Sequence, residues 1–318
     1  MIRNRVPSPR RSRGAALLIA MSLLVLVTTL AAGMVWQQHR AIQVEAAERS
    51  RTQSAWILNG ALDWARLILR EDARSGGPTA LSEPWATPLA EARLSTFLAA
   101  DKDHNSSDAD SGPDAFLSGS IVDLQSRYNL RNLVDGNKIV ETELPILQRL
   151  CEAAGAPTDT AARIAEGLRA AWAGGDTQGS GVPLAPRTVT QLQWLGIDPA
   201  VLERLQNFVV LLPIRTTVNI NTADAEVIAA VTPGLDPGAA QALVQTRQRG
   251  AYKTVEMAKN QAKLLDPKNV GVTSNYFEVR GKLRLDERAL EERSIVERRG
   301  LDIVTILRER VASLVTDR

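Results

Sequence analysis

The stretch that decides the fold is RGAALLIAMSLLVLVTTLAAGMVW, from Arg13 to Trp36. Its last 22 residues, Ala15 to Trp36, carry no charged side chain. With a helical rise of about 1.5 Å per residue, this run is long enough to cross the hydrocarbon core of a bilayer, about 30 Å thick. A secretory signal peptide has a shorter apolar core of about 7–15 residues, followed by a small-residue cleavage site. The run therefore predicts a transmembrane helix.

The residues before this run give the helix a direction. The first 14 residues hold five arginines and no acidic residue. Lys and Arg next to a membrane span stay on the cytoplasmic side. We therefore expect residues 1–14 to be a cytoplasmic basic leader, residues 15–36 to span the membrane, and the rest of the chain to lie across it.

The net charge and the scarcity of cysteine and histidine limit the possible functions of the chain after the leader. Without the five leader arginines the chain has 33 basic and 36 acidic residues, a net charge of −3. Non-specific nucleic-acid binding depends on basic residues that neutralise phosphates, so this balance counts against it. The single cysteine, Cys151, excludes an intrachain disulfide. His39 and His104 are the only histidines, which leaves little material for a histidine-based site.

The helical pattern continues beyond the membrane span, without a proline from His39 to Arg70. Apolar residues there recur at spacings of 4, 3 and 4, which predicts one face of an amphipathic helix. The residues on this face are Ile57, Ala61, Trp64 and Ile68. We expect residues 37–72 to continue the helix to a total length of about 85 Å. The Gly76-Gly77-Pro78 segment should end it. We also expect Trp56 and Trp64 to pack against the head.

After the helix, residues 73–140 predict the first part of a β framework. A helical piece near 89–99 precedes residues 118–134, where apolar and polar side chains alternate as in a strand. Strand character returns in residues 266–318, most clearly over 275–285.

The segment between these strands, residues 141–265, is helical in pattern. Two later stretches, 294–299 and 301–308, are ambiguous between strand and helix. Because strands must pair to satisfy their backbones, the helical segment is best explained as an α-domain inserted into one sheet. The predicted fold class is α+β: a long N-terminal helix, a pilin-like antiparallel sheet, and a large inserted all-α domain of helix hairpins, SAM-like in type.

A repeat within the insert predicts these hairpins. Leu195-Gly-Ile-Asp-Pro199 is followed 38 positions later by Pro233-Gly-Leu-Asp-Pro237. In each copy the glycine, Gly196 or Gly234, should end one helix with a positive φ. The aspartate, Asp198 or Asp236, should cap the next helix, and proline should occupy its first turn.

The N-terminus resembles the leader of class III, type IV prepilin-like proteins. In that family a membrane aspartyl peptidase cuts after the glycine and methylates the new N-terminus; Gly14 and Ala15 match these two positions. Most members have glutamate at the fifth mature position, where this chain has Ile19. The leader without this acid resembles the general secretion pathway protein K family of type II secretion minor pseudopilins. An uncleaved signal anchor is the alternative.

Two further segments resemble the same family. They are the NLRNL stretch, Asn129 to Leu133, whose asparagines we interpret as turn and bridging residues, and the VNINTA stretch, Val218 to Ala223. The resemblance implies a non-enzymatic subunit that initiates or caps the tip of a periplasmic pseudopilus. It also implies an inner-membrane location with a periplasmic head. The implied partners are other minor pseudopilins, the major pseudopilin, the prepilin peptidase and the inner-membrane secretion platform.

The runner-up is a minor pilin of a type IV pilus or DNA-uptake system, because VNINTA and the following hairpin resemble the helix-hairpin-helix modules of DNA-uptake receptors. Asp198 and Asp236, however, place carboxylates where phosphates would approach. We interpret Arg247, Arg249 and Lys253 as a solvated helix face, and nucleic-acid binding is not expected.

Neither catalysis nor a metal site is predicted. The sequence contains no G-x-S-x-G, H-E-x-x-H or P-loop motif. Residues 101–105 lack the glycine and glutamate of an EF-hand calcium loop. Relatives in the protein K family hold calcium with a D-W-x-D-x-D stretch, but the corresponding residues here, 171–176, keep one acid, so we assign no calcium ligand and expect no cofactor.

Overall fold

The computed structural model describes residues 13–94, 115–173, 184–285 and 288–314. The chain divides into two compact units, residues 1–57 and 58–318, which are considered one at a time. Residues 1–12 of the predicted leader lie outside the described residues.

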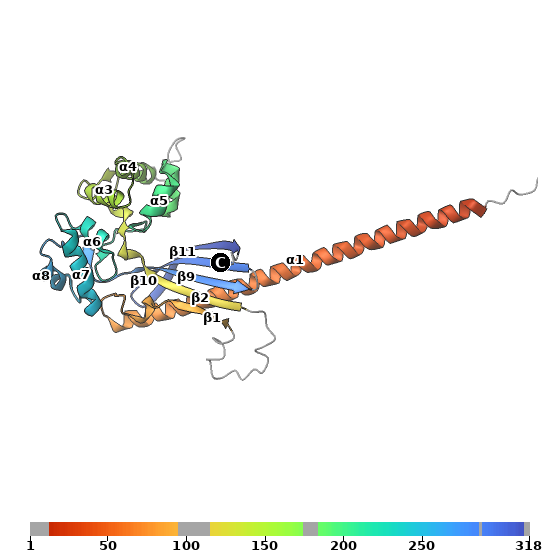
Figure 1. The fold of residues 1–318 in the computed structure, drawn as a ribbon, viewed down its shortest axis with the longest axis horizontal. Coiled ribbons are helices and arrows are strands. Elements are labelled where there is room, and N and C mark those ends of the chain that lie inside the picture. Colours follow the sequence, from red (N-terminus) through yellow and green to blue (C-terminus); the bar gives the residue numbers. More distant parts are fainter. Residues whose placement is uncertain (1–12, 95–114, 174–183, 286–287, 315–318) are drawn as a thin grey trace, which may run out of the picture. The chain divides into compact units, whose positions relative to one another are not determined.

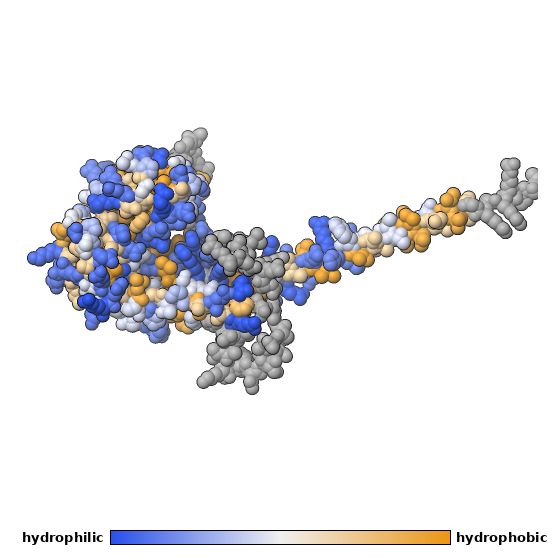
Figure 2. All heavy atoms as spheres, in the orientation of Figure 1, coloured by the Kyte–Doolittle hydropathy of each residue, from blue (hydrophilic) through white to orange (hydrophobic). Residues whose placement is uncertain are grey.

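The first unit is the N-terminal part of helix α1 (Arg13–Ser75). The apolar run is helical throughout, as predicted, and α1 begins two residues before Ala15. The apolar part of this helix buries none of its side chains against the rest of the chain. Figure 2 shows its apolar residues at the surface. In the described part of the chain this is the one helix that is long and apolar enough to cross a membrane.

The second unit begins with the last part of α1, which packs on a sheet. The face that it buries contains Leu58, Leu62, Ala65 and Leu69. The predicted face was therefore wrong by one position, and Trp56 and Trp64, 72% and 46% exposed, do not pack in the core. The leucine stripe permits a close approach: a Cβ on Gly281 in the sheet would lie 3.2 Å from Leu58 Cδ2. An indole at that contact would hold the helix further away.

The sheet has five strands in the order β1-β2-β9-β10-β11, and all neighbours are antiparallel (Figure 1). The strands are β1 (Leu89–Arg93), β2 (Ala115–Asp123), β9 (Tyr276–Leu285), β10 (Arg288–Arg299) and β11 (Asp302–Leu314). The stretches that were ambiguous in sequence are therefore strands. Alternate residues of β9, including Phe277 and Val279, face α1 and join its leucine stripe in one apolar cluster with Trp85.

Strand β1 corrects a prediction. The sequence predicted a helical piece near residues 89–99, but Leu89–Arg93 pairs antiparallel with β2, Leu89 opposite Gly119 and Arg93 opposite Phe116. Residues 95–99 lie outside the described residues. The segment LAEAR has good helix formers, but pairing with the exposed edge of β2 overrides local preference.

The helical segment enters between two adjacent strands. β2 ends at Asp123 and β9 begins at Tyr276, yet the two strands are paired directly, with Ile121 opposite Val279. The helices between them are α3 (Leu144–Ala153), α4 (Thr160–Ala173), α5 (Pro199–Leu205), α6 (Ala225–Val231), α7 (Pro237–Arg249) and α8 (Val255–Gln261). These helices enclose their own apolar core, separate from that of the sheet. The predicted α+β class with a helical insertion is therefore correct.

Short strand pairs and 3₁₀ turns complete the fold. β3 (Tyr128–Asn129) pairs parallel with β6 (Val209–Val210), and β7 (Val218–Asn219) pairs parallel with β8 (Val270–Gly271). A small hairpin joins β4 (Val134–Asp135) to β5 (Lys138–Ile139). The 3₁₀ turns are η1 (Pro84–Ala86), η2 (Leu124–Ser126), η3 (Leu130–Leu133) and η4 (Val189–Leu195).

Candidate functional site

Where the insert leaves and rejoins the sheet, five polar residues meet in the interior, and we call them the polar junction. Asp123 ends β2, Asn219 and Thr222 belong to the VNINTA stretch, Ser274 precedes β9, and Thr79 follows α1. Each is at most 6% exposed. The junction therefore draws together chain segments that are far apart in sequence.

Asp123 is the centre of the polar junction. Its Oδ2 accepts hydrogen bonds from Ser274 Oγ and Thr222 Oγ1, each at 2.6 Å, and from Asn219 Nδ2 at 3.1 Å. Its Oδ1 accepts from Gln125 N at 2.8 Å. Burial raises the pKa of Asp123, and these four hydrogen bonds lower it in part. In the described structure this carboxylate is held by neutral donors alone, with no cation within ion-pair distance.

Asn219 extends the junction to the end of α1. Its Nδ2 also donates to Ser274 Oγ at 2.9 Å and to the carbonyl oxygen of Thr79 at 3.0 Å. Its Oδ1 accepts from Asn221 N at 3.0 Å. Buried polar groups with all partners in place fix one arrangement of the segments that carry them. We conclude that the VNINTA stretch attaches the insert to the sheet.

Arg298 continues this attachment from β10. Its guanidinium forms an ion pair with Asp72 at 2.7 Å and donates to Thr79 Oγ1 at 2.8 Å and to the Ser274 carbonyl. Burial and the nearby Glu83 raise the pKa of Asp72, and the bond to Arg298 opposes them. The end of α1, the sheet and the insert are thus connected by one polar network.

The NLRNL stretch makes a second attachment. Asn129 Nδ2 donates to the Ile214 carbonyl at 2.7 Å, and its Oδ1 accepts from Leu212 N at 3.1 Å. Asn132 bonds both the N–H and the carbonyl of Thr216, at 3.1 and 2.9 Å. The interpretation of these asparagines as bridging residues is confirmed.

The hairpin turns have similar geometry. Gly196 and Gly234 have φ of 77° and 80°. Asp198 accepts from Ala200 N at 2.7 Å at the start of α5. Asp236 accepts from Gly238 N at 2.8 Å and Ala239 N at 3.2 Å at the start of α7. Each carboxylate thereby occupies N–H groups that a phosphate would need.

Arg247 was interpreted as part of a solvated face, and this was wrong. Its guanidinium donates to the carbonyls of Ile220 and Ala223, at 2.6 Å for Ile220, and burial lowers its pKa. Arg247 therefore supports the VNINTA stretch from behind, whereas Arg249 is exposed. No local pattern predicts this role, because the two carbonyls lie 27 and 24 positions away along the chain.

Residues suited to chemistry are scarce. The described residues hold no group of three or more His, Cys, Asp or Glu that could bind a metal. The two candidate calcium segments lie outside the described residues, 101–105 entirely and 171–176 in their last three positions. Cys151 is 3% exposed, and burial raises the pKa of its thiol to about 11, so the thiol is protonated at neutral pH.

The predicted processing site lies at the beginning of α1. Gly14 and Ala15 are in its first turn, and Ile19, at the fifth mature position, is 61% exposed. Cleavage after Gly14 and methylation of Ala15 stay predictions, as does the significance of Ile19.

Comparisons with known proteins agree with one another. The family model "Type II secretion system (T2SS), protein K" matches residues 218–280, a stretch that contains Asn219, Thr222 and Ser274. The type II secretion system protein K of Pectobacterium carotovorum subsp. carotovorum is 26% identical, over 94% of this chain and 96% of its own length. That of Pseudomonas aeruginosa is also 26% identical, over 88% and 86%.

A solved structure has a similar fold. It is a chain of the crystal structure of the GspK–GspI–GspJ complex from the enterotoxigenic Escherichia coli type 2 secretion system. The match has a TM-score of 0.61 and 19% identity, and it covers 84% of this chain and 99% of that one.

Proposed function

Since the chain belongs to the type II secretion system protein K family, we propose that it is a structural minor pseudopilin that initiates or caps the tip of a periplasmic pseudopilus. The observation that carries the proposal is the architecture: an apolar helix continues into a head whose sheet packs on α1, and the head holds a helical insert between β2 and β9. This architecture suits a subunit that is drawn from a membrane into a filament.

Position at the tip is supported by Ile19. In pilin-like assemblies, the glutamate at the fifth mature position is thought to neutralise the free amine of the neighbouring subunit. An unpaired ammonium in apolar surroundings costs at least a few kcal/mol. With isoleucine at this position the chain offers no such pairing to a subunit above it. The insert, which occupies the chain between Asp123 and Tyr276, would also crowd repeated lateral neighbours.

The proposed partners and location follow from the same role. The structural relative comes from a complex of GspK, GspI and GspJ, which supports assembly of this chain with other minor pseudopilins. We propose that it also meets the major pseudopilin, the prepilin peptidase and the secretion platform. The apolar helix would sit in the inner membrane, with the N-terminus cytoplasmic and the head periplasmic. The role requires no catalysis and no cofactor.

Labelling tests the tip position. A gold-labelled tag in the helical insert, on overexpressed pseudopili, should appear at most once per filament, at the end distal to the membrane. Label spaced along the shaft would refute the proposal.

Ile19→Glu should increase self-polymerisation, whereas the control Leu18→Glu, which puts the acid about 100° away around the helix, should not. Equal behaviour of Ile19→Glu and wild type would also count against the tip.

Mass spectrometry of the N-terminal peptide tests processing. In cells that hold the matched peptidase we expect a chain that begins at methylated Ala15, and an unprocessed chain in a Gly14→Val variant. An intact Met1 terminus, or a cut beyond Trp36, would remove the basis for a pilin-like subunit.

A mobility shift at low salt separates this role from DNA uptake. Phosphate contacts are strongest there, and we expect no shift. A shift that disappears in Arg249→Gln would favour a DNA-uptake pilin instead.

A further inference from the structure

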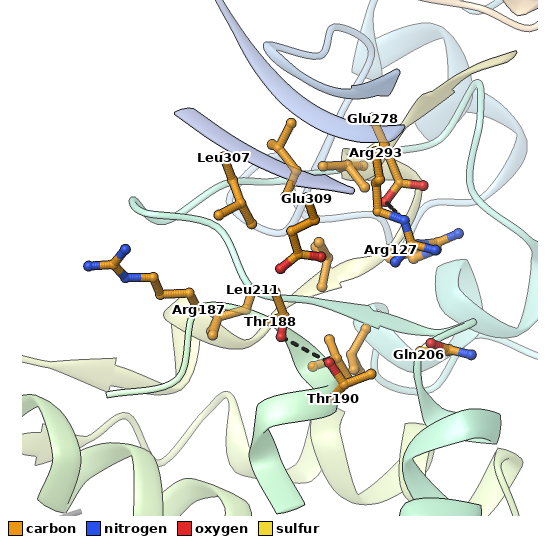
Figure 3. A pocket seen from close by; sticks show the side chains of 15 residues that line it. Arg127, Arg187, Thr188, Thr190, Gln206, Leu211, Glu278, Arg293, Leu307 and Glu309 are labelled. Carbon is orange, nitrogen blue, oxygen red and sulfur yellow. Dashed lines mark hydrogen bonds and ion pairs between the residues drawn. The ribbon is translucent and has the colours of Figure 1, made fainter. Parts of the chain in front are cut away.

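A small cleft of about 80 Å³ lies between the sheet and the insert, on the face of β9–β11 opposite α1 (Figure 3). Glu278, Arg293 and Glu309 line it from the sheet. Thr188 and Thr190, near the start of η4, line it from the insert. Pockets for drug-sized ligands have volumes of about 300–1,000 Å³, so this one accepts only a small group.

Three arginines gather around Glu278. This carboxylate, with its side chain 7% exposed, already forms an ion pair with Arg280 on its own strand. Arg293 Nε approaches its other oxygen at 3.5 Å. Arg127 lies close enough to both arginines to be influenced by their charge. Three guanidinium groups therefore share one buried carboxylate.

Arg127 is the least satisfied of the three. Among the residues that the structure describes, its guanidinium makes no hydrogen bond and no ion pair. Burial lowers the pKa of Arg127, and Arg280 and Arg293 add to this effect, while Glu278 and Asp224 oppose it. Figure 3 shows its guanidinium beside that of Arg293. Arg127 is partly buried, and an anion bound beside it would give its guanidinium a direct charged partner.

The wall of the cleft that the insert forms offers hydrogen-bond donors to the same anion. Thr188 and Thr190 have their hydroxyl oxygens 3.0 Å apart, and Gln206 contributes an amide. Arg187 lines the cleft as well and is exposed to solvent. Arginine forks and hydroxyls are suited to planar or tetrahedral oxygen anions.

We propose that this cleft is a binding site for a small oxyanion, which Arg127 and Arg293 hold against the threonine hydroxyls. The source is either inorganic phosphate or a carboxylate presented by another protein, and both share this chemistry. The site is independent of the position of the chain in a filament. Glu309, which also lines the cleft and has no ion-pair partner in the described structure, limits the affinity by like-charge repulsion.

Calorimetric titration of the full chain in detergent tests the site, with inorganic phosphate in one arm and acetate in the other at constant ionic strength. Binding of phosphate, alone or with acetate, would identify a free anion as ligand. Binding of acetate alone would identify a carboxylate. Binding of neither anion overturns the proposal.

Two variants connect binding to the cleft. Arg127→Gln should weaken binding by about tenfold or more, the loss expected for a charged hydrogen bond. The matched control Arg249→Gln removes an exposed arginine outside the cleft and should bind like wild type. Glu309→Gln should bind several-fold more tightly, an effect that general destabilisation would not produce. Wild-type affinity in both Arg127→Gln and Glu309→Gln would place the anion elsewhere and refute the proposal.

Discussion

Two regions of the head bury a carboxylate. In each region different partners replace the hydrogen bonds that the carboxylate would make to water. At the polar junction, Asp123 is 2% exposed and accepts only from hydroxyl, amide and backbone donors. On the sheet face that packs on α1, Glu292 is 3% exposed and pairs with Arg308 and Arg310, at 2.5 and 2.6 Å. The first carboxylate has neutral partners, and the second has two cations.

The difference concerns what each carboxylate holds together. The partners of Glu292 lie on β11, directly beside β10, and their guanidinium groups reach solvent. The donors to Asp123 come from the start, the interior and the end of the 152-residue excursion that separates β2 from β9. Removal of the Glu292 carboxylate should therefore destabilise only the β10–β11 hairpin, whereas removal of the Asp123 carboxylate should destabilise the attachment of the whole insert to the sheet.

The largest expected effect comes from Asp123→Ala. It removes four buried hydrogen bonds and leaves Ser274 Oγ and Gln125 N without the acceptor that they have in the described structure. Each unsatisfied donor can cost about 1–3 kcal/mol, so we expect a loss of about 3 kcal/mol or more in unfolding free energy. Urea unfolding of the full chain in detergent measures it. Limited proteolysis should show the insert cut first. Asp302→Ala, at an exposed aspartate, is the control and should be near neutral.

Thr222→Val should have an intermediate effect. It keeps the shape of the side chain and removes one hydrogen bond, of 2.6 Å, to Asp123. The expected loss is about 1–2 kcal/mol by the same measurement. A loss equal to that of Asp123→Ala would mean that Thr222 alone carries the junction.

Glu292→Gln should cost less than Asp123→Ala, about 1 kcal/mol, since Arg308 and Arg310 are 32% and 44% exposed and can be solvated by water. This corresponds to a fall of about 2–4 °C in Tm for a head of this size. If Glu292→Gln destabilises the protein more than Asp123→Ala, the proposed contrast between the two regions is wrong.

The mildest test changes only pH. Burial raises the pKa of Asp123 in the folded state, so its contribution to stability is fully present below the pKa of the unfolded chain and is lost as pH rises through the folded pKa. The unfolding free energy of wild type relative to Asp123→Asn should therefore decrease as the pH rises above about 4, the ordinary pKa of an aspartate. A difference that is constant, or that grows with pH, would show that the four donors outweigh burial.

The sequence by itself determined the features that depend on neighbours along the chain. The apolar run from Ala15 to Trp36 forms a helix in the structure. The glycines and aspartates at 196, 198, 234 and 236 form capped turns. In each case the decisive contacts lie within four residues, so local pattern is sufficient. The sequence also predicted that the helices are inserted into one sheet, because the strands on either side of them must pair with each other.

Tertiary structure alone decided the rest. The sequence offered two adjacent apolar stripes on α1, and close packing against Gly281 selected the one with Leu58 rather than Trp64. Pairing with β2 made a strand of Leu89–Arg93. The partners of Asp123 and Arg247, and the charges around Arg127, come from segments that only folding brings together. Long-range contacts of this kind leave no periodic trace in the sequence, because they depend on where distant segments meet and not on their spacing.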